Sequence, residues 1–360
     1  MIWLSWRQFR AQAITAAAAL AAFAILLALT ESHMNSLYAG SGLTGCRGGS
    51  CAGMASQFLV NLTSGHTLLL LPDGASLYVI LYFLSVLVIL AVPAIIGIFW
   101  GAPLIARELE TGTGRLAWNQ SVTRARWLAV KLTLTGAAAM AVTEAFSLLQ
   151  AWWAAPIGKA VGLGGSASII TEGRFGSFVF PTHGITPVGY AAFGFALGVT
   201  AGFVIQRAIP AMAVTLAIFA VIQLITPLWI RPHLLPAEQR ITTIAAAGAT
   251  AYPVGPTIAI NAAVAPGHPG AWIISSAAVS TAGQPARLPV ACESAAQREL
   301  GPAGSPALDN CLTSHGIRVA VSYQPVSRYW PLQFAETGLF LVLALALAWY
   351  CFWRLNRRRC

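Results

Sequence analysis

Charge is scarce in this chain. Charged residues make up 9% of the 360 residues, and lysine occurs only at positions 131 and 159. Soluble domains carry about 25% charged residues, whereas 57% of this sequence is apolar. The composition therefore excludes an ordinary soluble protein and predicts a membrane protein.

Several sequence motifs for nucleotide binding, metal binding and catalysis are also missing. No Gly-x-x-x-x-Gly-Lys-Ser/Thr loop occurs, since Lys159 follows Gly158 but the first glycine is absent. The six histidines form no His-x-x-x-His pair and no His-Glu-x-x-His motif, and Gly-x-Ser-x-Gly is absent too. We therefore expect no catalytic residues, no metal site and no cofactor bound by this chain.

Long apolar runs dominate what is present. A helix needs about 20 apolar residues to cross a bilayer, and six runs approach or exceed that length: 11–30, 77–100, 127–153, 188–205, 209–230 and 330–353. The predicted fold class is an all-α polytopic membrane protein with six transmembrane helices. Between the last two spans, residues 231–331 should form a mixed α/β or irregular extracytoplasmic insert, with short strands near 272–275 and 319–323.

Three parts follow from this pattern. Residues 1–230 form a membrane domain with an interfacial helix, five spans and a cytoplasmic loop at 102–126; residues 231–331 form the insert; residues 332–360 hold the sixth span and a basic tail. Trp3, Trp6 and Phe9 suit the membrane interface, although residues 1–12 can equally be the start of the first span. A cleaved signal peptide fits less well, because the first run is too long.

The basic residues give an orientation. With both termini inside, twelve of the 21 basic residues but only two of the 11 acidic residues fall in cytoplasmic segments. Because cytoplasmic loops retain Lys and Arg, this supports a multi-pass protein of the plasma membrane with both termini cytoplasmic. The net charge of +10 is thus explained by the orientation of the chain in the lipid bilayer, because the basic excess lies in the cytoplasmic segments. We expect no nucleic-acid partner.

Four cysteines fall in outer segments. Cys46, Cys51, Cys292 and Cys311 can form two disulfides in an oxidising space. Three pairings are possible, and we favour the local pairs Cys46–Cys51 and Cys292–Cys311. The alternative is free thiols.

The stretch 107–131 is a polar segment between the second and third spans. Glu108 and Glu110 are expected at the end of the cytoplasmic extension of the second span. Gly112 can terminate this helix, because glycine tolerates the left-handed conformation. Thr113 can cap a short amphipathic helix, while Ser121 or Thr123 can cap the third span. A short helix of this kind suits docking into a groove of a partner. A solvated loop that merely follows the charge rule is the simpler alternative.

The same stretch resembles the loop between the second and third spans of ABC-2 type transporter permeases. Glu108, Glu110, Gly112 and Thr113 match its first part, and Val122, Thr123, Arg124 and Lys131 match its second, although Ser121 replaces a proline and Gly114-Arg115 replaces Leu-Glu. The resemblance implies a permease subunit of an ATP-driven ABC exporter that forms half of a translocation pathway. It implies a separate ABC ATPase subunit that binds ATP and Mg²⁺, and a permease homodimer or heterodimer. The implied ATPase-coupling residues are Glu108, Glu110, Gly112, Thr113, Arg115, Arg124 and Lys131.

Glu144 lies deep in the third span, where an ionisable group is costly and tends to face an interior path. It is our candidate for the substrate pathway, against a structural hydrogen bond or a carboxyl that reaches outer water. Glu336, near the start of the sixth span, is expected at the interface.

Two other functions remain open from the sequence. A secondary, ion-coupled transporter predicts several ionisable groups at mid-membrane, and Glu144 is nearly alone. A non-transporting membrane sensor or scaffold would make the resemblance at 107–131 accidental.

Overall fold

The computed structural model describes residues 2–46, 51–64, 76–110, 123–165, 173–254, 257–263, 265–268, 270–297 and 306–357. The chain divides into two compact units. The first, Met1–Arg231 with Pro331–Cys360, is a helix bundle, and the second, Pro232–Trp330, contains the strands.

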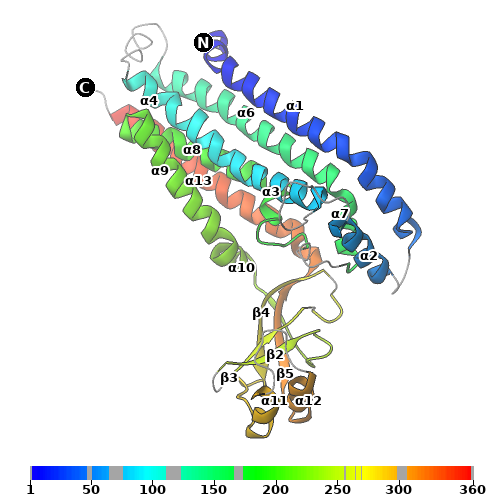
Figure 1. Cartoon of the computed structure of the whole chain (residues 1–360). Coiled ribbons are helices and arrows are strands. Elements are labelled where there is room, and N and C mark those ends of the chain that lie inside the picture. The colour runs from blue at the N-terminus through cyan, green and yellow to red at the C-terminus, as the bar shows by residue number, and fades with distance from the viewer. Residues whose placement is uncertain are drawn as a thin grey trace. The chain divides into compact units, whose positions relative to one another are not determined.

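Among the described residues, six helices are long and apolar enough to cross a membrane, which agrees with the six predicted spans. They are built from α1 (Ile2–Gly40), α3 with α4 (Leu77–Ile96, Ala102–Glu110), α6 (Arg124–Trp153), α8 (Thr186–Ile205), α9 with α10 (Ala208–Ile225, Arg231–Leu234) and α13 (Tyr329–Arg357). α1 begins and α13 ends at the same end of the bundle, which we call the terminal end (Figure 1).

The first helix runs without a break from Ile2 to Gly40. Residues 2–12 and the predicted span 11–30 therefore form one element, so that the start of the first span describes residues 2–12 better than a separate interfacial helix. The described part of the predicted loop 102–126 is also largely helical, since α4 prolongs the second span to Glu110.

Glycines bring α8 against the second span. Gly194, Gly198 and Gly202 follow one another at four-residue spacing on α8, which is almost wholly buried. A Cβ on Gly198 would lie 2.1 Å from the carbonyl oxygen of Gly97, and one on Gly202 would lie 2.3 Å from that of Ala102. Such stripes of small residues let two helix backbones approach closely within a membrane. The four-residue spacing of these glycines is the signal in the sequence that points to this contact.

The second span changes its helical pitch. Proline lacks a backbone N–H and disturbs the helix around it, and Pro93 lies inside α3. One turn later, residues Gly97–Gly101 form the π-helical segment η2, and α4 continues from there. A second π-helical segment, η4 (Thr226–Ile230), contains Pro227 and joins α9 to α10. π-helical turns of this kind often occur at functional sites.

Short elements cover the opposite end of the bundle. They are η1 (Leu43–Gly45), α2 (Cys51–Ser64), α7 (Ala155–Gly162) and η3 (Phe180–Thr182). The disulfide Cys46–Cys51 closes the connection into α2, as predicted. Phe58, Leu59 and Leu62 of α2 are buried in the same core as the long helices, so α2 is part of this unit rather than a free loop.

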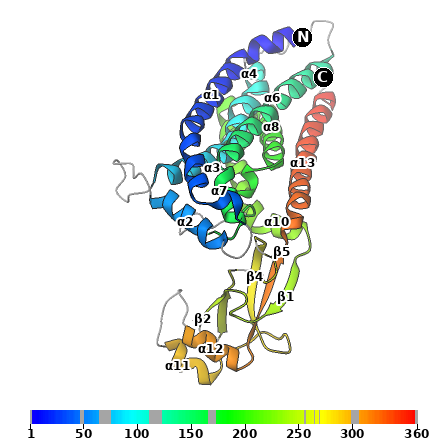
Figure 2. The same ribbon diagram turned by 90° about the vertical axis from the view of Figure 1, so that its right-hand side faces the viewer.

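The second unit is an antiparallel β structure with small helices (Figure 2). Its strands are β1 (Glu238–Thr242), β2 (Thr250–Val254), β3 (Thr257–Asn261), β4 (Trp272–Val279) and β5 (Arg318–Gln324). β5 lies between β1 and β4, and β2 pairs with β3. The predicted strands at 272–275 and 319–323 are thus neighbours, whereas the other three strands were not predicted.

Helices complete the core of this second unit. The short segments η5 (Val290–Cys292), α11 (Glu293–Gln297) and α12 (Pro306–Ser314) lie between β4 and β5, and η6 (Val326–Arg328) follows β5. Val319 and Val321 of β5 are fully buried, and Leu308 and Leu312 of α12 belong to the same cluster. The second predicted disulfide, Cys292–Cys311, holds α12 to the segment before α11.

Candidate functional site

Acidic residues at the end of α4 contact two other spans at the terminal end. Glu108 forms an ion pair with Lys131 of α6, whose side chain is 6% exposed. The amine of Lys131 also lies 4.8 Å from the ring centre of Trp127. A buried amine is costly unless it is paired, and an aromatic face stabilises it further. This cluster fastens α4 to α6.

Glu110 makes the second contact. Its carboxylate accepts a hydrogen bond of 3.1 Å from the backbone N–H of Ala208, the first residue of α9. The residue before it, Arg207, gives no side-chain cap. Because a helix N-terminus has unpaired N–H groups and a partial positive charge, the carboxylate of Glu110 acts as a cap supplied by another helix. α4 is therefore fastened to α9 as well.

The other predicted coupling residues are split by the structure. Gly112, Thr113 and Arg115 lie outside the described residues, as does Ser121, and Arg124 is the first residue of α6. Thr123 caps α6, because its side-chain oxygen accepts from the N–H of Arg126 at 3.3 Å. Glu108, Glu110 and Lys131 thus lie at the two places where the chain leaves and rejoins the described bundle.

The two glutamates have described partners on neighbouring helices: Glu108 pairs with a lysine, and Glu110 accepts from a helix N-terminus. The ion pair borders a small cavity of about 250 Å³ at the terminal end. Its lining combines polar and apolar side chains from α1, α4 and α6: Phe9, Gln12, Pro103, Leu104, Arg107, Glu108, Lys131 and Thr135.

A second ion pair is fully buried. The Nε atom of Arg231 lies 2.8 Å from Oε2 of Glu336, and Nη2 lies 3.2 Å from Oε1. Both side chains are 0% exposed. The guanidinium also stacks 4.3 Å from the ring centre of Phe180, and Tyr190 donates a hydrogen bond of 3.0 Å to Oε1 of Glu336. We expected Glu336 at the membrane interface; the structure shows that this carboxylate is buried by helices and paired with an arginine.

Gln333 extends this polar cluster by one turn of α13. Its side-chain oxygen accepts from the backbone N–H of Thr186 at 3.1 Å, and its amide donates to the carbonyl of Phe180 at 3.2 Å. Thr186 begins α8 and Phe180 begins η3. The cluster therefore joins α8, α10, α13 and the segment before α8. Opposite charges near the ends of two consecutive spans, at positions 231 and 336, are the signal in the sequence that could have suggested it.

Glu144 is half-buried in α6. Among the described residues its Oε2 atom, although enclosed, has no hydrogen-bond partner, and the same holds for both amide atoms of Gln150 on the same helix. Enclosed polar atoms without partners are costly, which sets these two side chains apart from the satisfied polar groups of the same helix, such as Thr135 and Thr143. Glu144 lines neither the cavity beside the ion pair nor the cavity between α1 and α3.

Histidine and cysteine meet in the second unit. Cys292, Cys311 and His315 place their ligand atoms within 4.8 Å of one another. Metal binding by cysteine needs thiolates, and both sulfurs are joined in the disulfide. This cluster is therefore a disulfide with a histidine against it.

The comparisons with known proteins concern the helix bundle. The family model for ABC-2 membrane transporter related proteins matches residues 17–231, which is well over half of the chain. No curated protein and no solved structure matches significantly. The match begins in α1 and ends at Arg231, where the first segment of the bundle ends too. The chain, whose described residues include six apolar membrane-capable helices, thus belongs to the ABC-2 membrane transporter related family and is a permease-type membrane transport protein.

Proposed function

We propose that this protein is the membrane subunit of an ATP-driven exporter, and that a separate ABC ATPase subunit docks at the terminal end of its bundle. The family supports a permease. The observation that carries the coupling is the pair of contacts made by Glu108 and Glu110, because they join the helix before the 111–122 segment to both α6 and α9. ATP and Mg²⁺ would be held by the ATPase.

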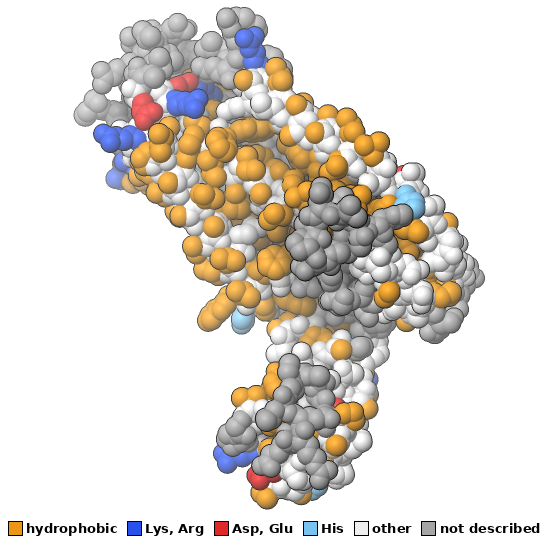
Figure 3. Space-filling view, viewed as in Figure 1, with side chains coloured by type: hydrophobic (Ala, Val, Ile, Leu, Met, Phe, Trp, Pro, Cys, Tyr) orange, Lys and Arg blue, Asp and Glu red, His pale blue; other side chains and the backbone are white. Residues whose placement is uncertain are grey.

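The terminal end is proposed to be cytoplasmic. On the visible face, charged side chains gather at this end, whereas hydrophobic side chains cover the helices along their length (Figure 3). The excess of arginine and lysine in the segments at this end follows the positive-inside rule. Both termini are then cytoplasmic, the protein lies in the plasma membrane, and the second unit, 232–330, is extracytoplasmic.

The proposed coupling is mechanical. A force on the 111–122 segment acts on the end of α4 and on the start of α6. From α4 the displacement reaches α6 through Glu108 and α9 through Glu110. The π-helical segment Gly97–Gly101 immediately precedes α4 in the chain. The second span can change its helical pitch at this segment. Such coupling requires an element with two conformations whose equilibrium is shifted both by the ATPase and by the transported substrate. We propose η2 as that element.

We further propose that two permease subunits, identical or different, complete the pathway, since six spans form half of it. Glu144 remains the candidate contact to cargo, because one of its carboxylate oxygens is enclosed without a described partner. A carboxylate at this depth favours a cationic or polar group.

The test exchanges the charges of the pair. Glu108→Lys should insert normally but lower the substrate-stimulated ATP hydrolysis of the ATPase, and the double variant Glu108→Lys, Lys131→Glu should recover part of it. Gly112→Val, in the predicted turn, should also lower it. The measurements are ATPase rate and substrate efflux in vesicles that contain both subunits, with the exposed Arg357→Ala as the control.

Two outcomes would contradict the proposal. Unchanged coupling in Glu108→Lys and in Gly112→Val would reduce the 107–131 stretch to a linker. Efflux driven by a proton or sodium gradient, with the permease alone in the vesicles, would favour an ion-coupled transporter instead.

A further inference from the structure

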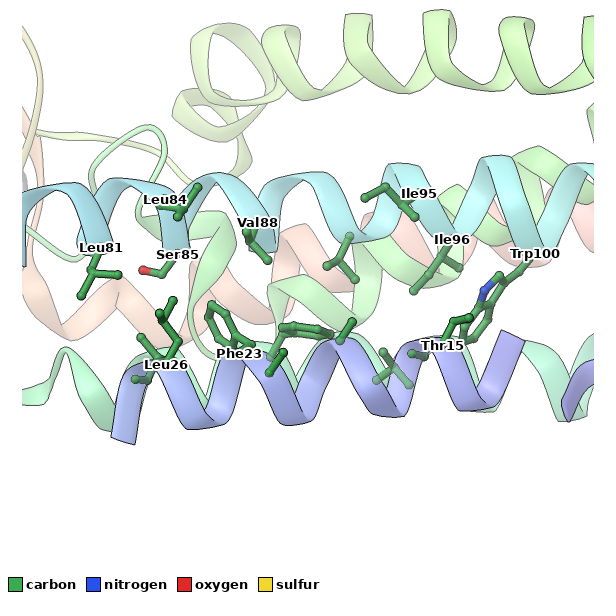
Figure 4. A pocket seen from close by; sticks show the side chains of 17 residues that line it. Thr15, Phe23, Leu26, Leu81, Leu84, Ser85, Val88, Ile95, Ile96 and Trp100 are labelled. Carbon is green, nitrogen blue, oxygen red and sulfur yellow. The ribbon is translucent and has the colours of Figure 1, made fainter. Parts of the chain in front are cut away.

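The structure contains a long groove between α1 and the second span, with α6 as its floor (Figure 4). α1 and α3 each pack on α6, whereas direct contacts between α1 and α3 are few. Ring contacts join α1 to the second span at the two ends of the groove. Phe9 meets Trp100 of η2 edge to face at 4.8 Å at one end, and His33 stacks on Tyr78 of α3 at 5.9 Å at the other.

Small side chains keep the groove open between these ends. Ala16, Ala19 and Ala22 of α1 line it, opposite Val88 and Val92 of α3. The cavity has a volume of about 650 Å³. Its lining on α1 runs from Thr15 to Leu27, which corresponds to about 18 Å of helix. Volume and length together give a mean cross-section of about 36 Å².

The walls offer little to a polar ligand. Trp100 carries an indole N–H at one end of the groove. The two hydroxyl groups of the lining are engaged by their own helices: Thr15 donates to the carbonyl of Gln12 at 2.9 Å, and Ser85 donates to that of Tyr82 at 2.7 Å. A glycan or peptide would lose most of its hydrogen bonds to water without replacement. The occupant must therefore be apolar over most of its length.

The groove is open to its surroundings and narrow. Leu26, Leu84 and Ile95 line it and are 43%, 46% and 48% exposed, on helices that cross the apolar part of a membrane. A helix of a second copy, about 10–12 Å wide, would need on the order of 1,400 Å³ over this length, about twice the volume that is present. A file of methylene groups is narrower, because carbon atoms pack at about 3.5–4.0 Å.

We propose that this groove binds an acyl chain of a membrane phospholipid, which enters sideways between α1 and α3. The occupant is stabilised by van der Waals contact with a wall that would otherwise face a void. The headgroup stays outside the groove, since the lining supplies no charge. This inference rests on the membrane location of the helices and not on coupling to an ATPase.

The test uses the full chain alone in nanodiscs that contain a phospholipid with a photoactivatable group in one acyl chain. After illumination, mass spectrometry locates the adducts. We expect them on the groove face of α1 and on α3, in preference to the opposite face of α1. Ala19→Phe should fill the groove and lower the adducts on α3 about fivefold or more. Ala21→Phe is the matched control, because Ala21 is exposed on α1 and does not line the groove.

Three results would overturn the inference. The first is equal labelling of both faces of α1 in the unmodified protein, which decides the matter even if Ala19→Phe does not fold. The second is unchanged labelling of α3 in Ala19→Phe. The third is a fall in labelling that accompanies dissociation of a dimer, since a second copy would then be the occupant. Because no ATPase is present, none of these results depends on the proposed coupling.

Discussion

Removing one partner of the buried ion pair should destabilise the bundle strongly. Arg231 and Glu336 are both 0% exposed and meet through two contacts of 2.8 and 3.2 Å. Arg231→Met leaves the carboxylate buried without its cation, although Tyr190 still donates to it. Breaking a buried pair in this way costs about 3–5 kcal/mol. Glu336→Gln leaves the guanidinium uncompensated and should cost a similar amount.

The double variant separates the charge from the packing. Arg231→Met with Glu336→Gln removes both charges but keeps a side-chain oxygen that can accept from Tyr190. Replacing a buried pair with uncharged groups is often neutral or stabilising, so we expect the double variant to be more stable than either single variant. The coupling free energy of the cycle, which is the sum of the two single costs minus the cost of the double variant, should then exceed about 3 kcal/mol.

The assay is equilibrium unfolding in detergent micelles, followed by far-ultraviolet circular dichroism. An exposed pair in the same chain supplies the control: Glu238 and Arg328 lie 3.0 Å apart with side chains 42% and 28% exposed. Glu238→Gln should therefore cost less than about 1 kcal/mol. If Arg231→Met is as stable as the unmodified protein, or if the double variant is no better than the singles, the pair does not hold the bundle as argued.

Three further predictions concern packing, the disulfide and pH. Gly198→Ala should lower the free energy of unfolding by at least about 1–3 kcal/mol, because its Cβ would meet backbone atoms. Gly338→Ala, whose Cβ would meet no atom within 4 Å, should be tolerated. Equal melting temperatures of the two variants would refute the close approach of the helices. Cys292→Ser opens the loop to Cys311, with a sequence separation of 19, and should destabilise the second unit by about 2–4 kcal/mol, as measured by proteolysis; four free thiols in a non-reduced digest would remove the premise. Burial lowers the pKa of His183, so the unfolded chain binds more protons below its ordinary pKa of about 6.5. Stability from this residue is then present above that pH and lost as the pH falls, and His183→Gln should melt with less acid sensitivity than the unmodified protein.

The membrane part of this fold could be predicted because a single property decides it. A helix that crosses hydrocarbon must be apolar over about 20 residues, so the six spans follow from the sequence directly. The local disulfides were the favoured choice among three pairings because the cysteines of each pair are close in sequence, and the structure has both of them. The strands at 272–279 and 318–324 carry enough apolar and β-branched residues to be found.

What was missed depends on contacts between distant residues. Arg231 and Glu336 are 105 positions apart, and each alone reads as a charge at the end of a span. The four-residue spacing of the α8 glycines indicates a close helix contact, but it does not tell that the second span is the partner. β1 pairs with β5 across about eighty residues and has a mostly exposed pattern. The roles of Gly112, Thr113 and Arg115 lie outside the described residues and stay predictions.

The position of the buried ion pair also bears on how the second unit came to be part of this protein. Arg231 is the last residue of the bundle before that unit, and Glu336 lies shortly after the chain re-enters the bundle at Pro331. Their side chains touch, so the points of departure and return are neighbours. Insertions are tolerated where the two ends of the inserted piece lie close together. The family match stops at the same arginine. Residues 232–330 therefore have the geometry of a removable module, and a short linker from 231 to 331 should leave the six spans able to assemble.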